Sequence, residues 1–218
     1  MSELTVNGEA LVLNADGALY WPDERLLVFS DLHFEKGSFF ATRGRMLPPY
    51  DTHATLARVS SLIVRYAPSH VIALGDSFHD EDAPARLASS QRDMLLALGN
   101  ATTWIWITGN HDPRPPAWLG GRVAEEIAIG GLVFRHEPSA EPFAGEIAGH
   151  LHPCKCVTRR GRTLRRRCFV SDGARLVMPA FGAYAGGLDV RDGAVRSLFA
   201  DEFRAYVLGA NRVYAVAA

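Results

Sequence analysis

The stretch "HVIALGDSFHD", residues 70–80, joins a strand-like apolar run to a cluster of ionisable side chains. Residues 71–74 have the length of a buried strand, and Asp76, His79 and Asp80 all lie within the five positions after Gly75. A strand that enters a polar loop would explain this stretch if it stood alone. The same pairing of an apolar strand with a polar end recurs along the chain, which indicates a site at one edge of a sheet.

The segments before this stretch predict a strand followed by a helix. Residues 25–30, "RLLVFS", have the length and composition of a buried strand. Residues 51–66 predict an amphipathic helix, with Asp51 as its N-cap and Pro68 as the residue that ends it.

The segments after this stretch continue the alternation of helices and strands. Residues 84–99 predict a helix with Gly99 as its C-cap, and residues 102–108 predict the next strand. This order is typical of a parallel sheet with helices between its strands. From residue 122 onward, short strands and tight turns predict an antiparallel meander. We therefore expect one mixed α/β domain over residues 1–218, without a linker or an internal repeat.

The composition places limits on location and on cysteine chemistry. The 218 residues carry a net charge of −1, so the overall charge favours neither nucleic acid nor acidic membranes. We see no signal peptide and no apolar run of the about 18 residues that a membrane span needs, which predicts a cytoplasmic protein with no membrane association. The odd number of cysteines argues against a disulfide framework. Cys154, Cys156 and Cys168 are better explained as small buried thiols than as a thiolate metal site.

Six of the eight histidines directly follow predicted strands, and only His53 and His70 lie elsewhere. The carboxyl ends of parallel strands lie side by side, so residues far apart in the sequence can meet there. A single histidine of this kind is more often structural, but five polar strand ends together favour a metal site. The candidate residues are Asp31, His33, Asp76, His79, Asn110, His111, Asp112, His136, His150 and His152.

The types of these side chains narrow the choice of metal. Imidazole mixed with carboxylate and amide oxygen suits Mn, Fe, Zn or Co better than Ca or Mg. The candidates are too many for one ion, and two-metal sites hold their ions about 3.5–4 Å apart with a shared carboxylate. Asp76 is the natural shared carboxylate, because it follows the middle strand of the expected parallel unit.

The polar strand ends form five blocks whose order resembles the calcineurin-like metallophosphoesterase superfamily. The blocks are Asp31-Leu32-His33, Gly75-Asp76, Gly109-Asn110-His111-Asp112, His136 and Gly149-His150-Leu151-His152. The resemblance implies an αββα fold, in which helices flank a β-sandwich, and a dinuclear metal centre, most simply with two Mn²⁺ ions. It also implies that Asp31, His33, Asp76 and His152 hold one ion, and that Asp76, Asn110, His136 and His150 hold the other.

A narrower resemblance covers the chain from about residue 25 to near the C-terminus. The segments "SDLHFEKG", "LPPYDT", "LGDSFHD", "GEIAGHLHP" and "MPAFGAYAGGLDV" are similar to the PdeM-type phosphoesterases, which are ligase-associated and act in the DNA damage response. That resemblance implies DNA as substrate, and an ATP-dependent DNA ligase, a helicase and an exonuclease as partners. The chain departs from the protein-phosphatase branch, which carries an Asp-Arg pair where this chain has "SFHD".

Two residues beside the expected ligand Asn110 are candidates for proton transfer. A two-metal site activates water for in-line attack on phosphorus, and the leaving alkoxide then benefits from a proton. His111 is the candidate general acid, and Asp112 is expected to orient its imidazole. The alternative is that His111 only donates a supporting hydrogen bond.

Further residues are candidates for substrate contacts. His79 and Asp80 could support the site, touch substrate or belong to a surface loop. Lys36 and Arg114 follow their blocks closely and could meet phosphate oxygens, although exposure to solvent explains them equally well.

Two segments carry arginine at high density. Residues 158–167, "TRRGRTLRRR", hold six arginines, and residues 39–45, "FFATRGR", add two more behind two phenylalanines. Guanidinium groups suit phosphate contacts and phenylalanine rings suit stacking on unpaired bases, so Arg165, Arg166 and Arg167 are candidate substrate contacts. A solvated hairpin and a packed loop are the alternatives.

Three functions therefore remain open at this level. The first is a metal-dependent phosphodiesterase that acts on DNA in bacterial repair. The second is a phosphodiesterase or phosphatase of small nucleotides. The third, a non-catalytic scaffold with the same fold, is disfavoured because such scaffolds lose metal ligands and no ligand is missing here.

Overall fold

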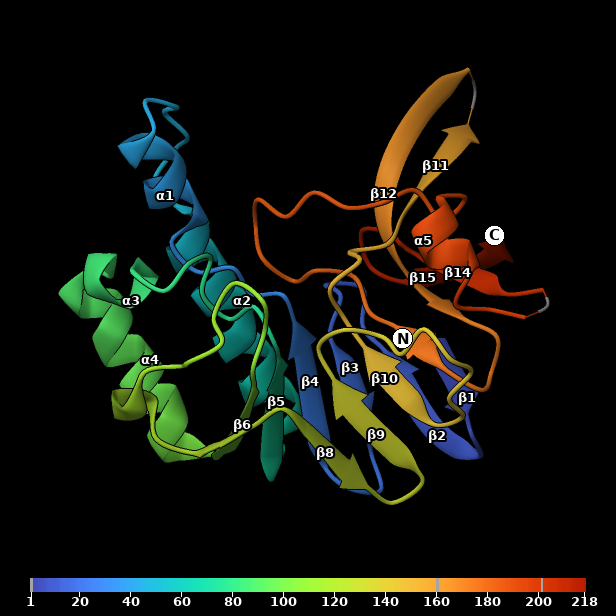
Figure 1. The fold of residues 1–218 in the computed structure, drawn as a ribbon, viewed down its shortest axis with the longest axis horizontal. Helices are drawn as coiled ribbons and strands as arrows, with labels where there is room; N and C mark the ends of the chain where they lie inside the picture. The colour runs from blue at the N-terminus through green and yellow to red at the C-terminus, as the bar shows by residue number, and fades with distance from the viewer. Residues whose placement is uncertain (1, 160, 201) are drawn as a thin grey trace.

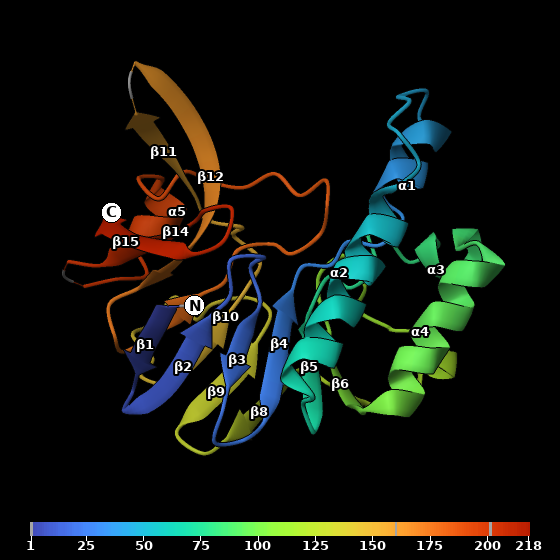
Figure 2. The same cartoon turned by 180° about the vertical axis from the view of Figure 1, so that it is seen from behind.

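Two stacked β-sheets form the middle of the fold, and helices cover their outer faces (Figures 1 and 2). The structure, a computed structural model, describes residues 2–159, 161–200 and 202–218. These layers confirm the αββα arrangement expected from the sequence. The helices of the described residues are α1 (Lys36–Thr42), α2 (Asp51–Tyr66), α3 (Ala83–Arg86), α4 (Ser89–Ala101) and α5 (Gly193–Arg196), with a 3₁₀ turn, η1 (Ala117–Leu119).

The first sheet contains the expected parallel unit. Among the described residues its strands run in sequence order: β1 (Ser2–Val6), β2 (Glu9–Leu13), β3 (Leu19–Trp21), β4 (Leu26–Ser30), β5 (His70–Leu74), β6 (Thr103–Ile107) and β7 (Arg122–Ala124). The pairs from β1 to β4 are antiparallel, and those from β4 to β7 are parallel.

The second sheet is mixed, which corrects the expected antiparallel meander. Its described strands are β8 (Glu126–Ile129), β9 (Leu132–Arg135), β10 (Glu146–Ala148), β11 (Cys154–Arg159), β12 (Arg162–Ser171), β13 (Leu176–Val177), β14 (Arg204–Leu208) and β15 (Val213–Ala217). β10 pairs in parallel with both β9 and β13. The meander was inferred from short strands and turns, but strand direction depends on the connections. The connection between β9 and β10 is long enough to bring the chain back to the end of the sheet at which β9 begins. β10 can therefore run in the same direction as β9.

The parallel strands β4, β5 and β6 are largely buried on both faces, with successive side chains pointing to opposite layers. In β4, Leu26 and Val28 pack in the core between the sheets, whereas Leu27 and Phe29 pack in the core beneath the helices. Because both faces of β4 are buried, its sequence is a continuous apolar run. The same packing fixes the position of the polar residues that follow the strand.

Helix α2 spans the residues expected from the sequence, but Asp51 does not cap it. Tyr50 occupies the N-cap position, and Asp51 is the first helical residue. The Asp51 carboxylate instead accepts a hydrogen bond of 2.8 Å from the backbone N–H of Gly37. Asp51 therefore ties the start of α1 to α2.

The helix expected over residues 84–99 is divided into α3 and α4. Leu87 and Ala88 are extended, and the side chain of Gln91 accepts a hydrogen bond from the backbone N–H of Ala88 to begin α4. Gly99 lies inside α4, not at its C-cap, and a Cβ there would come within 3.2 Å of the Leu119 carbonyl oxygen.

The exposure of each cysteine depends on its position in β11 or β12. Cys154 and Cys168 are buried, as expected, and Cys156 is exposed on β11. Cys156 was wrongly predicted to be buried, because β11 and β12 form a hairpin that projects from the body of the molecule (Figure 1). No helix of the described residues is long and apolar enough to cross a membrane.

Candidate metal centre

The strand ends converge at one edge of the two sheets. Ser30 pairs with Leu74, and Leu74 with Ile107, so β4, β5 and β6 end at the same level. In the second sheet, Ala148 pairs with Arg135, which brings the ends of β9 and β10 together. The parallel pairing of β9 with β10 is therefore what brings the later histidines to the site.

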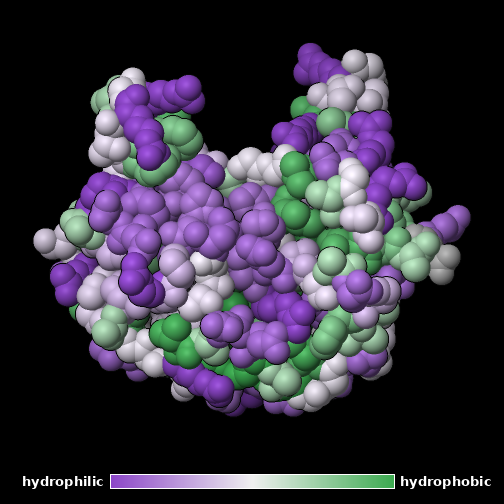
Figure 3. Space-filling view, in the orientation of Figure 1, coloured by the Kyte–Doolittle hydropathy of each residue, from purple (hydrophilic) through white to green (hydrophobic). Residues whose placement is uncertain are grey.

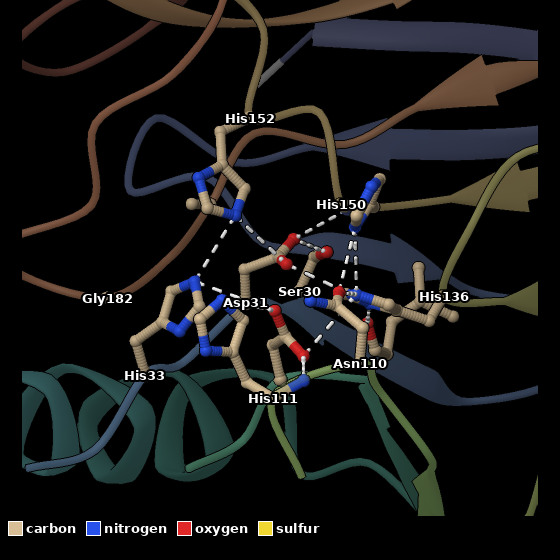
Figure 4. Close-up of polar contacts among 12 residues, drawn as sticks. Ser30, Asp31, His33, Asn110, His111, His136, His150, His152 and Gly182 are labelled. Carbon is tan, nitrogen blue, oxygen red and sulfur yellow. Dashed lines mark hydrogen bonds and ion pairs between the residues drawn. The ribbon is translucent and has the colours of Figure 1, made fainter. Parts of the chain in front are cut away.

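One cluster of side chains consists of Asp31, His33 and His152, whose ligand atoms lie within 4.8 Å of one another. His152 Nε2 is 3.0 Å from Asp31 Oδ1, and the Nε2 atoms of His33 and His152 face each other at 3.3 Å. Figure 4 shows the His152 ring directed toward both the Asp31 carboxylate and the His33 ring. Two imidazole lone pairs and one carboxylate oxygen around a common point are a donor set that suits a transition-metal ion.

A second cluster gathers around His136. Its Nε2 lies 3.4 Å from Asp76 Oδ1, 3.0 Å from Asn110 Oδ1 and 3.3 Å from His150 Nδ1. His136 Nδ1 lies 3.1 Å from the carbonyl oxygen of Leu74, which places a proton on Nδ1 and leaves the Nε2 lone pair for a metal.

Asp76 lies between the two clusters. Its Oδ2 is 3.9 Å from His33 Nε2, and its Oδ1 faces His136. One carboxylate oxygen is thus directed at each cluster, the arrangement that a carboxylate shared by two ions requires. Asp31 also belongs to both groups of potential ligands, which the sequence pattern did not indicate.

Five of the candidate ligands adopt a left-handed backbone conformation. The φ angles are 52° at Asp31, 46° at His33, 47° at Asp76, 66° at His150 and 48° at His152. This conformation costs a non-glycine residue about 1–2 kcal/mol and persists where the surroundings enforce it. Backbone hydrogen bonds supply part of that enforcement, since His33 N–H donates to the Asp76 carbonyl at 2.9 Å.

Glycines precede the ligands where other ligands pack closely against the backbone. A Cβ on Gly75 would lie 2.2 Å from the His136 ring, and a Cβ on Gly109 would lie 2.2 Å from Asp76 Oδ1. These distances explain the Gly-Asp and Gly-Asn pairs physically, because a side chain at either position would displace a candidate ligand.

Burial and the close contact of carboxylates with imidazoles shift the pKa values of several side chains in the site. Burial raises the pKa of Asp76, but its hydrogen bond with His136 and the nearby His33 outweigh burial and bring the pKa to about 2. Burial lowers the pKa of His33 to about 3, so its ring is neutral at pH 7. Burial also lowers the pKa of His136, but Asp76 and Asp31 raise it to about 9. A metal on His136 therefore has to displace a proton.

The sequence analysis missed two groups that support Asp31. The Ser30 hydroxyl donates to the Asp31 carboxylate, and the backbone N–H of Gly182 donates to the Asp31 carbonyl at 3.0 Å. Gly182 belongs to residues 180–187, a segment that we call the strap. The available signal in the sequence was the clustering of glycines in "AFGAYAGGL".

His111 lies beside the two clusters and is not part of either potential ligand group. Its Nε2 is 3.9 Å from Asp76 Oδ2, and its side chain is 40% exposed. Its Nδ1 lies 2.7 Å from the His79 carbonyl oxygen, and its ring stacks on the His79 ring at 4.9 Å. The ring is therefore held with Nε2 available at the edge of the site.

Asp112 does not orient His111, which corrects the expectation from sequence. Its carboxylate accepts a hydrogen bond from the backbone N–H of Phe78 at 3.1 Å, and the carbonyl of His79 takes the expected position beside the His111 ring. Burial, with Asp76 nearby, raises the pKa of Asp112 to about 7. Asp112 is buried beneath the loop that follows β5, so it supports the backbone of that loop.

His79 is buried beside the clusters and does not lie in a surface loop. Its Nδ1 is 3.4 Å from His33 Nδ1, and the Phe39 ring lies 4.5 Å from its ring. Lys36 is half-buried; burial lowers its pKa, and the negative charges of Asp31 and Asp76 oppose that effect. Both residues are therefore near the candidate ligands.

Two of the predicted substrate contacts are engaged elsewhere. Arg114 is exposed and pairs with Glu81 at 2.5 Å, because the proline-rich turn around it lies on the surface. Arg167 is half-buried at the base of β12, and its guanidinium donates to the carbonyl oxygens of the strap residues Ala180, Phe181 and Gly182. Arg165 and Arg166 are exposed, while Arg160 and the side chain of Arg159 lie outside the described residues.

The clusters lie at the base of a hollow between two projections. One projection is α1 with the loop to α2, residues 36–50, which we call the α1 arm; the other is the β11–β12 hairpin (Figures 1 and 3). Hydrophilic residues line much of the surface between them in Figure 3. A site of this shape is accessible to an extended ligand as well as to a small one.

Comparison with known proteins identifies the family. The family profile described as calcineurin-like phosphoesterase matches residues 24–164. The chain is similar to the nuclease MPE of Pseudomonas putida, with 32% identity, a TM-score of 0.79 and 99% of each chain covered. The E. coli phosphoesterase Yfce is a more distant structure, with 14% identity and a TM-score of 0.42 over 88% of this chain and 98% of that chain. Comparison with curated proteins gave no match.

The family expected from the five blocks is thus confirmed by a match over more than half of the chain. Members of this family use divalent metal ions, and the paired Asp and His clusters provide suitable ligands. The chain therefore belongs to the calcineurin-like phosphoesterase family, and it is a metal-dependent phosphoesterase.

Proposed function

We propose that this phosphoesterase hydrolyses phosphodiester bonds of DNA with two Mn²⁺ ions. The observation that carries the proposal is the position of both ligand clusters at the base of the hollow between the α1 arm and the β11–β12 hairpin (Figure 3). A polymer can cross such a hollow, whereas a small nucleotide would be held better by an enclosing pocket. The nuclease title of the Pseudomonas putida structure supports the same substrate class.

The residues of the two arms suit a nucleic-acid strand. Arg43 stacks on the Phe39 ring at 3.6 Å, and the side chains of Met46 and Tyr50 are exposed on the α1 arm. Arg165 and Arg166 are exposed on the hairpin. Guanidinium groups bind the phosphate backbone, and apolar and aromatic side chains contact unpaired bases.

The proposed chemistry divides between the ions and the protein. When bound, the two ions supply Lewis acidity and lower the pKa of water, which makes a nucleophile available near neutral pH. Asp31, His33, Asp76 and His152 would hold one ion, and Asp76, Asn110, His136 and His150 the other. His111, as an imidazolium, would donate its Nε2 proton to the leaving oxygen while the His79 carbonyl accepts from Nδ1.

The biological setting is also part of the proposal. The resemblance to PdeM-type phosphoesterases supports a cytoplasmic role in bacterial DNA repair, together with an ATP-dependent ligase, a helicase and an exonuclease. Three cysteines that form no disulfide are compatible with a reducing compartment.

A direct assay tests this function. Single-stranded and duplex oligodeoxynucleotides, an RNA of the same sequence and a cyclic dinucleotide are incubated with the Mn²⁺-loaded protein at several salt concentrations. Cleavage of DNA that falls as salt rises supports the proposal. Turnover of the dinucleotide with intact DNA would instead favour the small-nucleotide enzyme.

A further inference from the structure

A polar pocket of about 330 Å³, separate from the metal-ligand clusters, lies at the base of the β11–β12 hairpin. Four arginines and one carboxylate line it: Arg58, Arg165, Arg166, Arg167 and Asp16, with Ala15, Leu208 and Gly209 completing the wall. None of these residues belongs to the metal clusters. Arg58 comes from α2 and the other arginines from β12, so the fold brings like charges together from distant parts of the chain.

The arginines of this pocket lack anionic partners. Arg58 donates to the backbone carbonyl of Asp16 at 2.9 Å, and Arg167 donates only to carbonyls of the strap. Arg165 donates to the carbonyl of Gly187. Within the part of the chain that the structure describes, none of the four arginines forms an ion pair, and two of them, Arg58 and Arg167, are half-buried.

The excess of positive charge in the pocket affects the pKa of Arg58. Burial and the charge of Arg167, opposed by Asp16, together lower the pKa of Arg58 to about 10. Burial also lowers the pKa of Arg167. An anion in the pocket would offset the repulsion between the two guanidinium groups.

The lining also limits the kind of anion. The described residues that line the pocket include no aromatic ring, and the nearby ring of Phe181 is covered by the guanidinium of Arg58 at 4.1 Å. A phosphate group needs no aromatic face, and several guanidinium groups can bind its oxygens together. The pocket therefore fits the phosphate and not the base of a nucleic acid.

We propose that this pocket binds a phosphate group of the nucleic-acid strand, outside the scissile bond, and so holds the strand along the hairpin. This inference rests on the proposed function, because it takes the strand to be the substrate. The strap connects the two sites: Gly182 contacts Asp31, and Arg167 binds the carbonyls of the same strap residues. Free inorganic phosphate shares the required chemistry and is the alternative source.

The test uses the double variant Arg58→Gln/Arg166→Gln and the matched control Arg65→Gln/Arg204→Gln, which removes two exposed arginines outside the pocket. Glutamine at position 58 keeps an N–H donor and removes the positive charge. Thermal melting verifies that each variant is folded, and Arg166→Gln alone is used if the double variant is not. The Mn²⁺-loaded proteins are titrated with inorganic phosphate, and the KM for a single-stranded oligodeoxynucleotide is measured at several salt concentrations.

The proposal predicts that the pocket variant loses one phosphate site while the site at the metals remains. Its KM for the oligonucleotide rises about tenfold with little change in kcat, and the salt slope of binding flattens by about 0.7 for the lost contact. A lost phosphate site with unchanged oligonucleotide KM assigns the pocket to free phosphate and overturns the strand proposal. Unchanged values in all measurements overturn the pocket itself. Failure of wild-type protein to cleave DNA refutes the proposed function, and the phosphate titration still decides whether the pocket exists.

Discussion

The metal centre and the two arms beside it are built in opposite ways. Asp31 and Asp76 are almost fully buried. They follow β4 and β5, whose pairing fixes the positions of both strand ends. The arms project into solvent, and side chains near their tips, such as Met46 and Leu164, are exposed. The candidate ligands therefore lie in a closely packed edge of the sheets, whereas under the proposed function the substrate is selected by surfaces with few internal contacts.

The sharpest test of this division is Asp76→Asn. Because Asp76 faces both clusters, its replacement weakens both ions, and kcat/KM should fall by about 10³-fold or more on every substrate. Metal analysis after Mn²⁺ loading and turnover of a small aryl phosphodiester measure the two effects. Asp93→Asn, an exposed change on α4, serves as the control. Normal metal content with normal turnover would show that Asp76 is not the shared ligand.

His111→Ala separates proton transfer from metal binding at the same edge. His111 lies outside the ligand groups, so both metals should stay while turnover of esters with alkoxide leaving groups falls by about 10²–10⁴-fold. Activated aryl esters should lose much less, since a phenolate needs little protonation. His53→Ala, on the exposed side of α2, is the matched control. Loss of a metal from His111→Ala would refute its assignment as a residue that does not bind metal.

The convergence of the candidate metal ligands could be predicted from the sequence because it depends on local patterns. Apolar runs end in Asp, Asn or His, and parallel pairing brings such ends together whatever the length of the connections. Asp31, Asp76 and Asn110 therefore fall where the motif blocks placed them. The buried alternation of β4 and the bounds of α2 follow from the same kind of local signal.

Features that depend on distant contacts were not predictable in this way. The direction of β10 depends on the route of the preceding loop, and the role of Asp112 depends on which backbone N–H lies beside it. Arg167 belongs to the same run of arginines as the exposed Arg166, but its guanidinium donates to carbonyl oxygens of the strap. The run of arginines in the sequence does not show which guanidinium groups are exposed and which donate to the backbone.

A third prediction concerns the α1 arm. Arg43→Gln/Arg45→Gln should raise the KM for an oligodeoxynucleotide by about threefold to tenfold and flatten the salt slope by about 0.7 for each lost phosphate contact. Turnover of the small aryl ester serves as the internal reference, because that ester is too short to reach from the metals to the arm. Arg122→Gln, on β7, is the control. An equal loss on both substrates would mean that the arm shapes the metal centre and does not only contact the strand.

The smallest expected effect concerns the connection between the centre and the arm, which runs through Asp80 and Arg86. Arg86 donates to both carboxylate oxygens of Asp80, the neighbour of His79, and its Nε donates to the Ser38 hydroxyl on α1 at 2.9 Å. Partial burial raises the pKa of Asp80, but Arg86 outweighs it and holds the pKa below the ordinary value. A carboxyl group whose pKa is lower in the folded state stabilises the fold above its unfolded pKa of about 3.9 and loses that contribution as pH falls through the folded value.

Asp80→Asn should therefore lower the free energy of unfolding by about 0.2–1 kcal/mol at pH 7, the range of partly exposed ion pairs. Urea unfolding at pH 7, 5, 4 and 3 measures the difference from wild type, which should persist to about pH 5 and shrink below about pH 4 as the wild-type carboxylate takes up a proton. Added salt should reduce it at pH 7, because ions screen the pair. Asp93→Asn should show neither dependence. If the Asp80→Asn difference is the same at every pH, the Asp80 side chain holds the α1 arm through its shape or neutral hydrogen bonds. The charge of the carboxylate would then have no part in joining the arm to the metal centre.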